Sequence, residues 1–263
     1  ARQSIGAART LALQKADVVL LLGARLNWML HFGRSPRFNP DVKVIQVDVN
    51  AEEMHNSIRS HVAIHSDIVP FAHIFLDEIS KKKFRLNENH AWWKELQEKC
   101  EKNQQTVKAM SLDKTVPLNY YAVFHHLRQA IPSDCIIVSE GANTMDIGRS
   151  MLLNDLPRHR LDAGTFGTMG VGLGFAIAAA LYCRDYHPGK RVICVEGDSA
   201  FGFSGMEIET MIRYQLPIII VIVNNSGIYS GFSTDDYKSI QSMGDPTLMT
   251  PPTTLNAETH YEN

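Results

Sequence analysis

The chain has 263 residues, of which 44% are hydrophobic and 21% are charged, and its formal net charge at pH 7 is -2. This composition is typical of a soluble globular protein that buries one large core or two modest ones. The nearly neutral charge gives no reason to expect nucleic acid or an anionic membrane as a partner. No apolar run approaches the length that spans a bilayer, so we expect no membrane span.

The four cysteines are widely spaced and form no CxxC pair, which favours free thiols in a reducing compartment over disulfides or a zinc site. We expect the sequence to be an internal fragment of a longer protein, since it begins at Ala1 without an initiator Met and stops at Asn263.

The first 85 residues show the pattern of a Rossmann-like half sheet. A short helix over 7–16 is followed by apolar strands over 17–23 and 42–49, and a further strand and helix run from His61 to Ser80. No Gly-x-Gly-x-x-Gly is present. Asp48 lies near a strand end, where an acidic residue can bind a ribose hydroxyl. The alternative is a turn or capping aspartate.

A polar segment separates this half sheet from the second half of the chain. Residues 87–110 are polar and helix-prone, with Trp92 and Trp93 as the large apolar side chains, and we interpret them as a connecting helix. The predicted divisions are therefore a domain over 1–85, a helical linker over 86–115 and a second domain over 116–263.

The second domain opens with a helix and a strand. Apolar residues at helical spacing run from Leu118 to Ile131, and the strand 135–139 ends in Glu140-Gly141-Ala142-Asn143-Thr144. A strand that runs into such a turn is typical of a βα unit, with Asn143 or Thr144 available to cap the next helix.

Two further stretches precede the last strands. Arg158, His159 and Arg160 form a basic patch that is either surface charge or a site for phosphates. The segment 164–174 contains five glycines, a density that permits close backbone approach to a ligand or another helix. Taken alone, Met169 in this segment would be a core methionine.

The most informative stretch is 192–225. An apolar strand ends at Gly197-Asp198, Ser204 and Glu207 match a capping box, and a second apolar strand ends at Asn224-Asn225. A strand–helix–strand crossover brings both strand ends to one edge of a parallel sheet, so we expect Asp198 and Asn225 to lie close together.

The groups at this edge suit a hard metal on a phosphate. The Asp198 carboxylate, the Asn225 amide oxygen and the Gly227 carbonyl are ligands that Mg²⁺ accepts. The N–H groups of Ser199 and Ala200 precede the expected helix and could meet an anion. The alternative is an ordinary set of βα turns.

These residues resemble a known family. Gly197-Asp198-Ser199 followed by Asn224-Asn225 is similar to the cofactor motif of thiamine diphosphate enzymes, although Ser199 stands where a third glycine is usual. Within 196–205, this departure resembles the branch that acts on acyl-CoA, namely oxalyl-CoA decarboxylase and 2-hydroxyacyl-CoA lyase. The stretch 227–235 resembles the lyase more closely, and the similarity extends over nearly the whole chain.

The resemblance implies an α/β fold of parallel sheets with flanking helices: part of a Rossmann-like middle domain, then a thiamine diphosphate-binding domain. It implies Mg²⁺ at Asp198, Asn225 and Gly227, and diphosphate at Ser199 and Ala200. In thiamine diphosphate enzymes, a bulky residue at the position that matches Met169 forces the cofactor into a bent shape. Further cofactor contacts implied by the resemblance are Gly141, Ala142, Asn143, the carbonyl of Gly167, Ile228 and Tyr229, with Arg25 and Asp48 at an adenine nucleotide such as ADP.

The implied reaction is cleavage of a 2-hydroxyacyl-CoA into formyl-CoA and an aldehyde one carbon shorter, as in fatty acid alpha-oxidation. The alternatives are an oxalyl-CoA decarboxylase, an acetolactate synthase-like enzyme or a non-catalytic nucleotide-binding module.

No catalytic residue is assignable in the chain. The resemblance places the catalytic glutamate in an N-terminal domain that precedes Ala1, usually supplied by the partner subunit. We therefore expect the chain alone to be inactive, and the intact protein to be a homodimer or homotetramer. The resemblance implies a peroxisomal location, and otherwise a cytoplasmic one.

Overall fold

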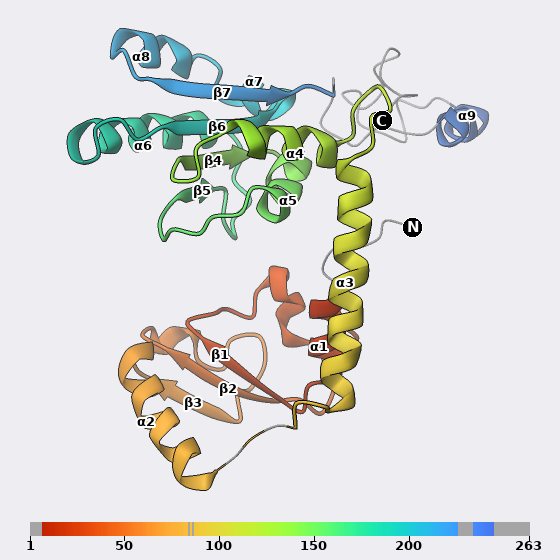
Figure 1. Cartoon of the computed structure of the whole chain (residues 1–263), viewed down its shortest axis with the longest axis vertical. Coiled ribbons are helices and arrows are strands. Elements are labelled where there is room, and N and C mark those ends of the chain that lie inside the picture. The colour runs from red at the N-terminus through yellow and green to blue at the C-terminus, as the bar shows by residue number, and fades with distance from the viewer. Residues whose placement is uncertain (1–6, 84, 86, 226–233, 245–263) are drawn as a thin grey trace. The chain divides into compact units, whose positions relative to one another are not determined.

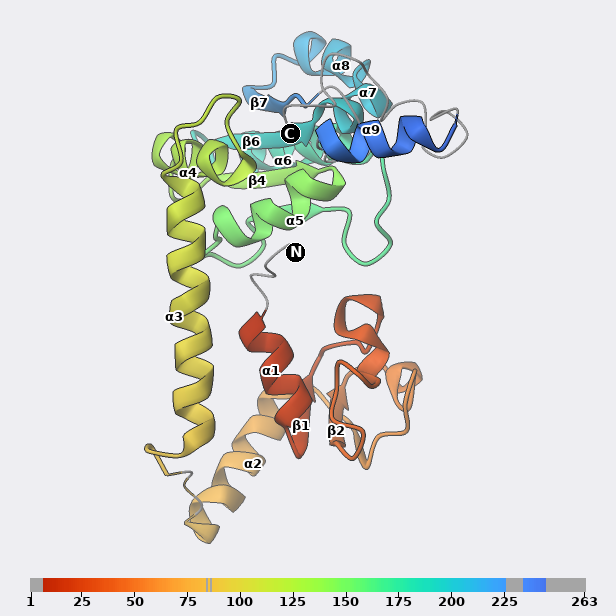
Figure 2. The same ribbon diagram turned by 90° about the vertical axis from the view of Figure 1, so that its right-hand side faces the viewer.

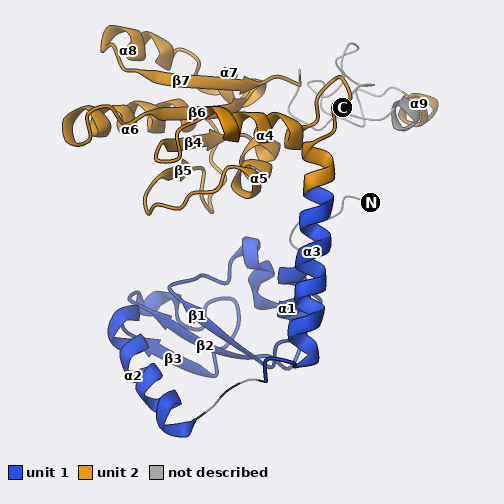
Figure 3. Cartoon of the chain, viewed as in Figure 1, with its two compact units in different colours: residues 1–107 blue, residues 108–263 orange. Residues whose placement is uncertain are grey.

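The computed structural model describes residues 7–83, 85, 87–225 and 234–244 of the chain. It divides into two compact units, residues 1–107 and residues 108–263, which Figure 3 colours separately. The division falls inside helix α3 (Ala91–Ser111), the helix expected to connect the two halves. The predicted boundaries after residues 85 and 115 remain predictions.

The first unit contains a three-stranded parallel sheet in the order β1-β2-β3. This arrangement confirms the predicted half sheet. Short 3-10 helices, rather than α-helices, follow β1 and β2. The elements of this unit before α3 are α1 (Ala7–Lys15), β1 (Val18–Leu22), η1 (Trp28–Gly33), β2 (Lys43–Asp48), η2 (Ala51–Glu53), β3 (Val62–His65) and α2 (Ile68–Lys82).

The second unit is built on a four-stranded parallel sheet in the order β5-β4-β6-β7 (Figure 1). Its central strands, β4 and β6, are apolar runs that are almost entirely buried, as expected for a parallel sheet covered on both faces. The elements are α4 (Tyr120–Ala130), β4 (Ile136–Glu140), α5 (Ala142–Met151), β5 (Arg160–Asp162), α6 (Gly172–Tyr186), β6 (Val192–Gly197), α7 (Asp198–Ser204), α8 (Glu207–Arg213), β7 (Ile218–Val223) and α9 (Thr234–Ser242).

Helices cover both faces of this sheet, and successive residues of a strand point to opposite faces. On one face, Val138 and Cys194 pack with Leu173 of α6 and Met211 of α8. On the other face the packing partners come from α4 and the end of α5: the buried residues there are Phe124, Cys135, Ile137, Leu152, Ile193 and Val195. Figure 2 shows the helices of this unit from the side.

The predicted capping box is wrong. The turn after β6 leads directly into α7, so Ser204 is the last residue of that helix instead of an N-cap. The next helix, α8, begins at Glu207 after Met206, which makes no side-chain capping bond. The pattern failed because its two members belong to two short helices.

The turn after β4 also differs from expectation. Helix α5 starts at Ala142 with Gly141 as its N-cap, so Asn143 and Thr144 lie inside its first turn and neither caps it. Gly141 has a φ of +104°, a backbone conformation that a residue with a side chain rarely adopts.

The basic patch before the glycine-rich segment is partly structural. Arg160 lies in β5, a short strand that the sequence did not predict. It donates to the Asn154 side chain at 2.8 Å and to the Leu152 carbonyl.

Within the described residues, no helix is both long enough and apolar enough to cross a membrane.

Candidate functional site

The carboxyl ends of β4, β6 and β7 meet at one edge of the second sheet. Glu140 pairs with Glu196, and Gly197 pairs with Val223. Asp198 therefore follows the end of β6 directly, and Asn225 lies two residues beyond the end of the neighbouring strand β7. This register confirms that the two strand ends lie side by side at one edge, as predicted. In open α/β sheets, this edge is where ligands bind.

Helix α7 begins at this edge. Asp198 is its first residue, and Ser199 and Ala200 lie in its first turn rather than before it, which corrects the expectation. N–H groups in the first turn have no partner inside the helix, and they lie at the positive end of its dipole. The start of α7 therefore offers donors and positive potential beside the Asp198 carboxylate.

Glycines bring two turns close together here. A side chain added to Gly141 would meet the Gly197 nitrogen at 3.4 Å, the Thr144 hydroxyl oxygen at 3.4 Å and the Ala200 Cβ at 3.5 Å. The backbones of the β4–α5 and β6–α7 turns can approach each other, or a ligand, because neither glycine carries a side chain.

This edge fits a magnesium-bound diphosphate. Asp198 supplies a carboxylate and Asn225 an amide oxygen, which are hard oxygen ligands, and the glycine turns and the start of α7 supply backbone donors for an anion. In the described part of the chain, no three His, Cys, Asp or Glu side chains gather as a metal cluster. A cation at this edge would therefore rely on Asp198 together with amide and carbonyl oxygens.

Tyr120 of α4 reaches the same edge, which sequence reasoning missed. Burial raises the pKa of Tyr120, the Asn143 side chain lies close enough to its hydroxyl to lower this pKa, and the nearby negative charge of Asp198 raises it. The resulting pKa lies above its ordinary value, so the phenol stays protonated at neutral pH. The only available signal was the sequence Asn119-Tyr120, in which Asn119 caps α4 by accepting from the Ala122 nitrogen at 3.0 Å.

The glycine-rich segment connects β5 to α6 within the same unit. Gly167 and Gly170 have positive φ angles, of 62° and 82°. Met169 is 41% exposed, so it is not the core methionine that its residue type alone indicated. Phe166 is 93% exposed. The middle of the segment is thus turned to solvent.

Two buried carboxyl groups lie beneath this segment. Glu140 and Glu196 are paired residues on neighbouring strands, and neither has any exposed surface. Glu140 accepts hydrogen bonds from the Gly170 and Gly172 nitrogens. The Glu196 Oε1 accepts from the Cys194 thiol at 3.3 Å. Burial, opposed by this hydrogen bond and reinforced by the charge of Glu140, raises the pKa of Glu196 to about 7.

The raised pKa of Glu196 predicts a pH-dependent stability. The ordinary pKa of this carboxyl is 4.5 and the folded value is about 7, so between these values the folded protein binds more protons than the unfolded chain. The contribution of Glu196 to the free energy of unfolding should therefore fall as the pH rises from about 4.5 to about 7, by about 3 kcal/mol in total.

The variant Glu196→Gln keeps the size of the side chain and removes its titration. Urea unfolding of the metal-free, full-length protein at pH 5 and pH 8 checks the prediction. The variant should gain stability over wild type at the higher pH. An equal difference between the two proteins at both pH values would contradict it.

Arg25 and Asp48, predicted at an adenine nucleotide, lie in the first unit, and both make contacts within it. Arg25 pairs with Glu53 at 2.9 Å, and Asp48 is a buried residue that accepts from the Asn50 nitrogen at 2.9 Å. These contacts account for both side chains without a ligand. Three predicted contacts, Gly227, Ile228 and Tyr229, lie outside the described residues.

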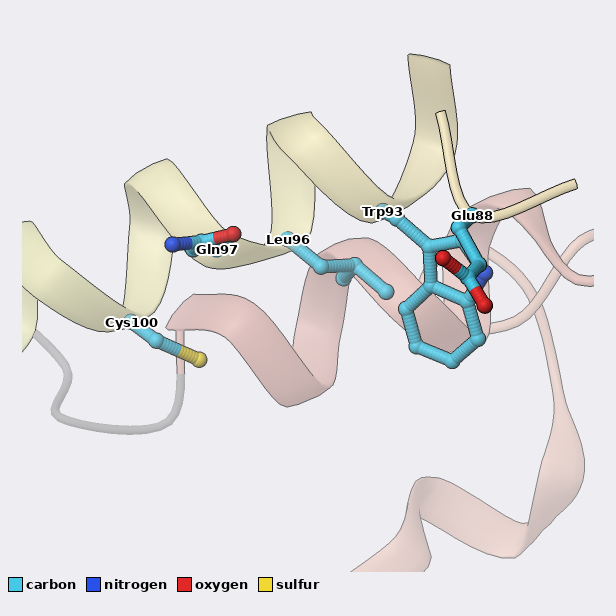
Figure 4. A pocket seen from close by; sticks show the side chains of 5 residues that line it. All are labelled: Glu88, Trp93, Leu96, Gln97 and Cys100. Atoms are coloured by element: carbon cyan, nitrogen blue, oxygen red, sulfur yellow. The ribbon is translucent and has the colours of Figure 1, made fainter. Parts of the chain in front are cut away.

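A hollow of about 590 Å³ lies along α3 in the first unit (Figure 4). Its lining residues are Glu88, Trp93, Leu96, Gln97 and Cys100. None of the predicted site residues is among them, so the hollow and the candidate edge are separate features.

Two parts of the chain match two domains of one enzyme family. The central domain of thiamine pyrophosphate enzymes matches residues 3–74, and their C-terminal TPP-binding domain matches residues 140–247. The chain belongs to the thiamine pyrophosphate enzymes. The candidate edge, from Gly141 to Asn225, lies within the match to the C-terminal TPP-binding domain of this family.

Among curated relatives of this family, 2-hydroxyacyl-CoA lyase 1 from Homo sapiens is 55% identical over 258 residues, which cover 98% of this chain and 45% of the relative. Oxalyl-CoA decarboxylase from Escherichia coli (strain K12) is 41% identical over 236 residues, covering 88% of this chain and 40% of the relative. The chain thus spans less than half the length of these relatives.

A solved structure from Mycobacterium smegmatis, described as that of a thiamin diphosphate-dependent enzyme, superposes with a TM-score of 0.60 at 19% identity. The match covers 87% of this chain and 42% of that chain. It confirms the predicted α/β architecture of parallel sheets with flanking helices. The comparisons give no support to an adenine nucleotide at Arg25 and Asp48.

Proposed function

We propose that the full-length protein is a thiamine diphosphate- and Mg²⁺-dependent lyase that cleaves a 2-hydroxyacyl-CoA into formyl-CoA and an aldehyde one carbon shorter. The observation that carries this proposal is the 55% identity to 2-hydroxyacyl-CoA lyase 1 over 98% of the chain. The lower identity of 41% to oxalyl-CoA decarboxylase makes decarboxylation the second candidate.

In this proposal, Asp198 and Asn225 hold the Mg²⁺, together with the carbonyl of Gly227. Ser199 and Ala200, in the first turn of α7, donate to the diphosphate. The turn Gly141-Ala142-Asn143 would contact the same anion, since Gly141 leaves room for close approach.

The remaining predicted residues would contact the rings of the cofactor. The Gly167 carbonyl would accept a hydrogen bond from the cofactor, Met169 would support its bent shape, and Ile228 and Tyr229 would be further contacts. Tyr120 offers its hydroxyl oxygen as an acceptor to the Asn143 amide and so helps to orient Asn143. When bound, thiamine diphosphate supplies the carbon nucleophile and electron sink that carbon–carbon cleavage needs.

The rest of the proposal concerns the whole protein. The catalytic glutamate comes from a further domain, usually that of a partner subunit, in a homodimer or homotetramer. The domain borders lie after residues 85 and 115. The enzyme takes part in fatty acid alpha-oxidation in the peroxisome.

The test is product identification with the full-length protein, thiamine diphosphate and Mg²⁺. A long-chain 2-hydroxyacyl-CoA should yield formyl-CoA and the shortened aldehyde in equal amounts by mass spectrometry, and oxalyl-CoA should yield little CO₂. CO₂ from oxalyl-CoA alone would move the assignment to the decarboxylase. Neither product, with thiamine diphosphate still bound, would favour an acetolactate synthase-like enzyme or a non-catalytic module.

A further inference from the structure

The segment between β5 and α6 is fixed at its two ends by carboxylates, one from Asp162 at the end of β5 and one from Glu140 in β4. At the β5 end, Asp162 accepts from the Gly164 nitrogen at 2.9 Å. Asp162 is itself held by Arg149 of α5 through two hydrogen bonds of 2.9 Å. A bidentate arginine of this kind fixes the carboxylate in position as well as in charge.

Electrostatics support this first anchor. Burial alone would raise the pKa of Asp162, but hydrogen bonds from Arg149 and Gly164, with the charges of Arg149 and Arg160, bring it below its ordinary value. The group is therefore a carboxylate at any pH at which the protein would be studied, and its contact with the segment persists.

At the α6 end, the anchor is Glu140 of β4. Its Oε1 accepts from the Gly170 nitrogen and its Oε2 from the Gly172 nitrogen, the latter at 2.5 Å. Gly172 is the first residue of α6, and the N-cap residue Val171 makes no side-chain capping bond. A helix N-terminus usually obtains a hydrogen-bond acceptor from its own N-cap side chain. In α6 the Glu140 carboxylate, which comes from β4, is the acceptor instead.

This second anchor is shielded from solvent. Glu140 has no exposed surface, and hydrogen bonds from N–H groups to a buried carboxylate are stronger than those at a surface. Between the two anchors, the segment has little packing of its own: Phe166 and Met169 are exposed, and a side chain added to Gly167 would meet no atom within 4 Å.

We propose that Glu140 and Asp162 are positioning residues that preform the segment 163–171, and thereby fix Gly167 and Met169 at the carboxyl edge of the sheet before cofactor binds. The inference rests on the proposed function in one respect: only in a thiamine diphosphate enzyme would Gly167 and Met169 contact the cofactor. It adds two residues, in different strands, to those that determine the geometry of the site. Neither is expected to touch cofactor or substrate.

The first test needs no cofactor. In the cofactor-free, full-length protein, Glu140→Gln replaces one acceptor oxygen by an NH₂ group, which would face a backbone N–H. Amide hydrogen exchange of the peptide covering 164–174, followed by mass spectrometry, should become faster by about ten- to a hundredfold, the effect of losing a charge-assisted hydrogen bond.

The matched control is Ser139→Ala. Ser139 is the preceding residue of β4, faces the other side of the sheet, and is buried, with a hydroxyl that has no hydrogen-bond partner among the described residues. Exchange of 164–174 should be unchanged in this control. If Glu140→Gln yields too little folded protein, Asp162→Asn tests the other anchor and should accelerate exchange at 164–167.

The second test separates positioning from general destabilisation. In the loaded full-length enzyme, Glu140→Gln should lower the rate of hydrogen–deuterium exchange at C2 of thiamine diphosphate, counted per bound cofactor, by about tenfold or more, because misplacement by about 1 Å is costly. The dissociation constant of thiamine diphosphate and the KM for the acyl-CoA should change little, since Asp198 and Asn225 are untouched.

Unchanged amide exchange in Glu140→Gln, or an unchanged C2 exchange rate per bound cofactor, would overturn the proposal. The proposed function fails independently of these results: its failure is the absence of both products from the wild-type enzyme, a result that leaves the amide exchange of 164–174 as a valid test of the two anchors.

Discussion

Replacement of Asp198 by Ala in the full-length protein should raise the dissociation constant of thiamine diphosphate, measured by calorimetry at a fixed Mg²⁺ concentration, by at least about 100-fold. Loss of a group that only orients a metal ligand typically costs 10- to 100-fold, so loss of a direct carboxylate ligand should cost no less. Asp198 begins α7 beside the end of β7, where its carboxylate and the Asn225 amide oxygen can share one cation. Aldehyde formation should fall with cofactor occupancy.

The control for this variant is Asp185→Ala. Asp185 is an exposed acid that pairs with Arg184 at 2.9 Å, and it lies near the end of α6 opposite to Gly172, the residue that Glu140 binds. The control should bind thiamine diphosphate as wild type does. Equal binding by Asp198→Ala and Asp185→Ala would show that Asp198 is not a metal ligand.

The second large effect is expected from Gly172→Ala. A Cβ at this position would overlap Glu196 Oε1 and would lie 2.9 Å from Glu140 Oε2, and both side chains are fully buried. Because neither can withdraw into solvent, α6 or the two strands must shift, and the Glu140 contacts with the segment would be lost. We expect the free energy of unfolding to fall by about 3 kcal/mol or more, at the upper end of the costs of overpacking.

Gly174→Ala is a closely matched comparison, two residues further along the same helix. Gly174 is exposed, and an added Cβ would meet nothing within 4 Å. Alanine is the better helix former, so this variant should be as stable as wild type or more stable by up to about 1 kcal/mol. Thermal unfolding of both full-length variants checks the pair. Similar melting temperatures for both would contradict the packing argument.

Much of the second unit could be predicted from short-range patterns. The apolar runs before Gly197 and Asn224 are parallel strands, of which β6 is buried and the edge strand β7 is partly exposed. The rule for strand–helix–strand crossovers correctly brought Asp198 and Asn225 to one edge. These inferences succeeded because strand burial and crossover handedness depend on few residues, all close in the sequence.

Other features depend on contacts that no local pattern contains. Glu140 lies 30 and 32 positions from the two nitrogens that it binds, so the sequence showed only an acid at a strand end. The contact between Tyr120 and Asn143 joins two helices in the same way. The three-residue strand β5 carries too few residues for a periodicity, and its arginine appeared as surface charge.

The Ser204 error has a different cause. Ser204 and Glu207 have the spacing of a capping box, but helix α7 already begins at Asp198, because the turn after β6 passes into a helix without a loop. A capping pattern indicates that a helix can start at a residue. It does not show whether that residue already belongs to a preceding helix.

The central claim is that the carboxyl edge of β4, β6 and β7 holds the metal and the diphosphate. A crystal structure of the full-length protein with thiamine diphosphate and Mg²⁺ tests it most directly. The account predicts Mg²⁺ bound by Asp198 and Asn225, the diphosphate against the first turn of α7, and the segment 163–171 in the same conformation with and without cofactor. A metal and diphosphate bound away from Asp198 would contradict it.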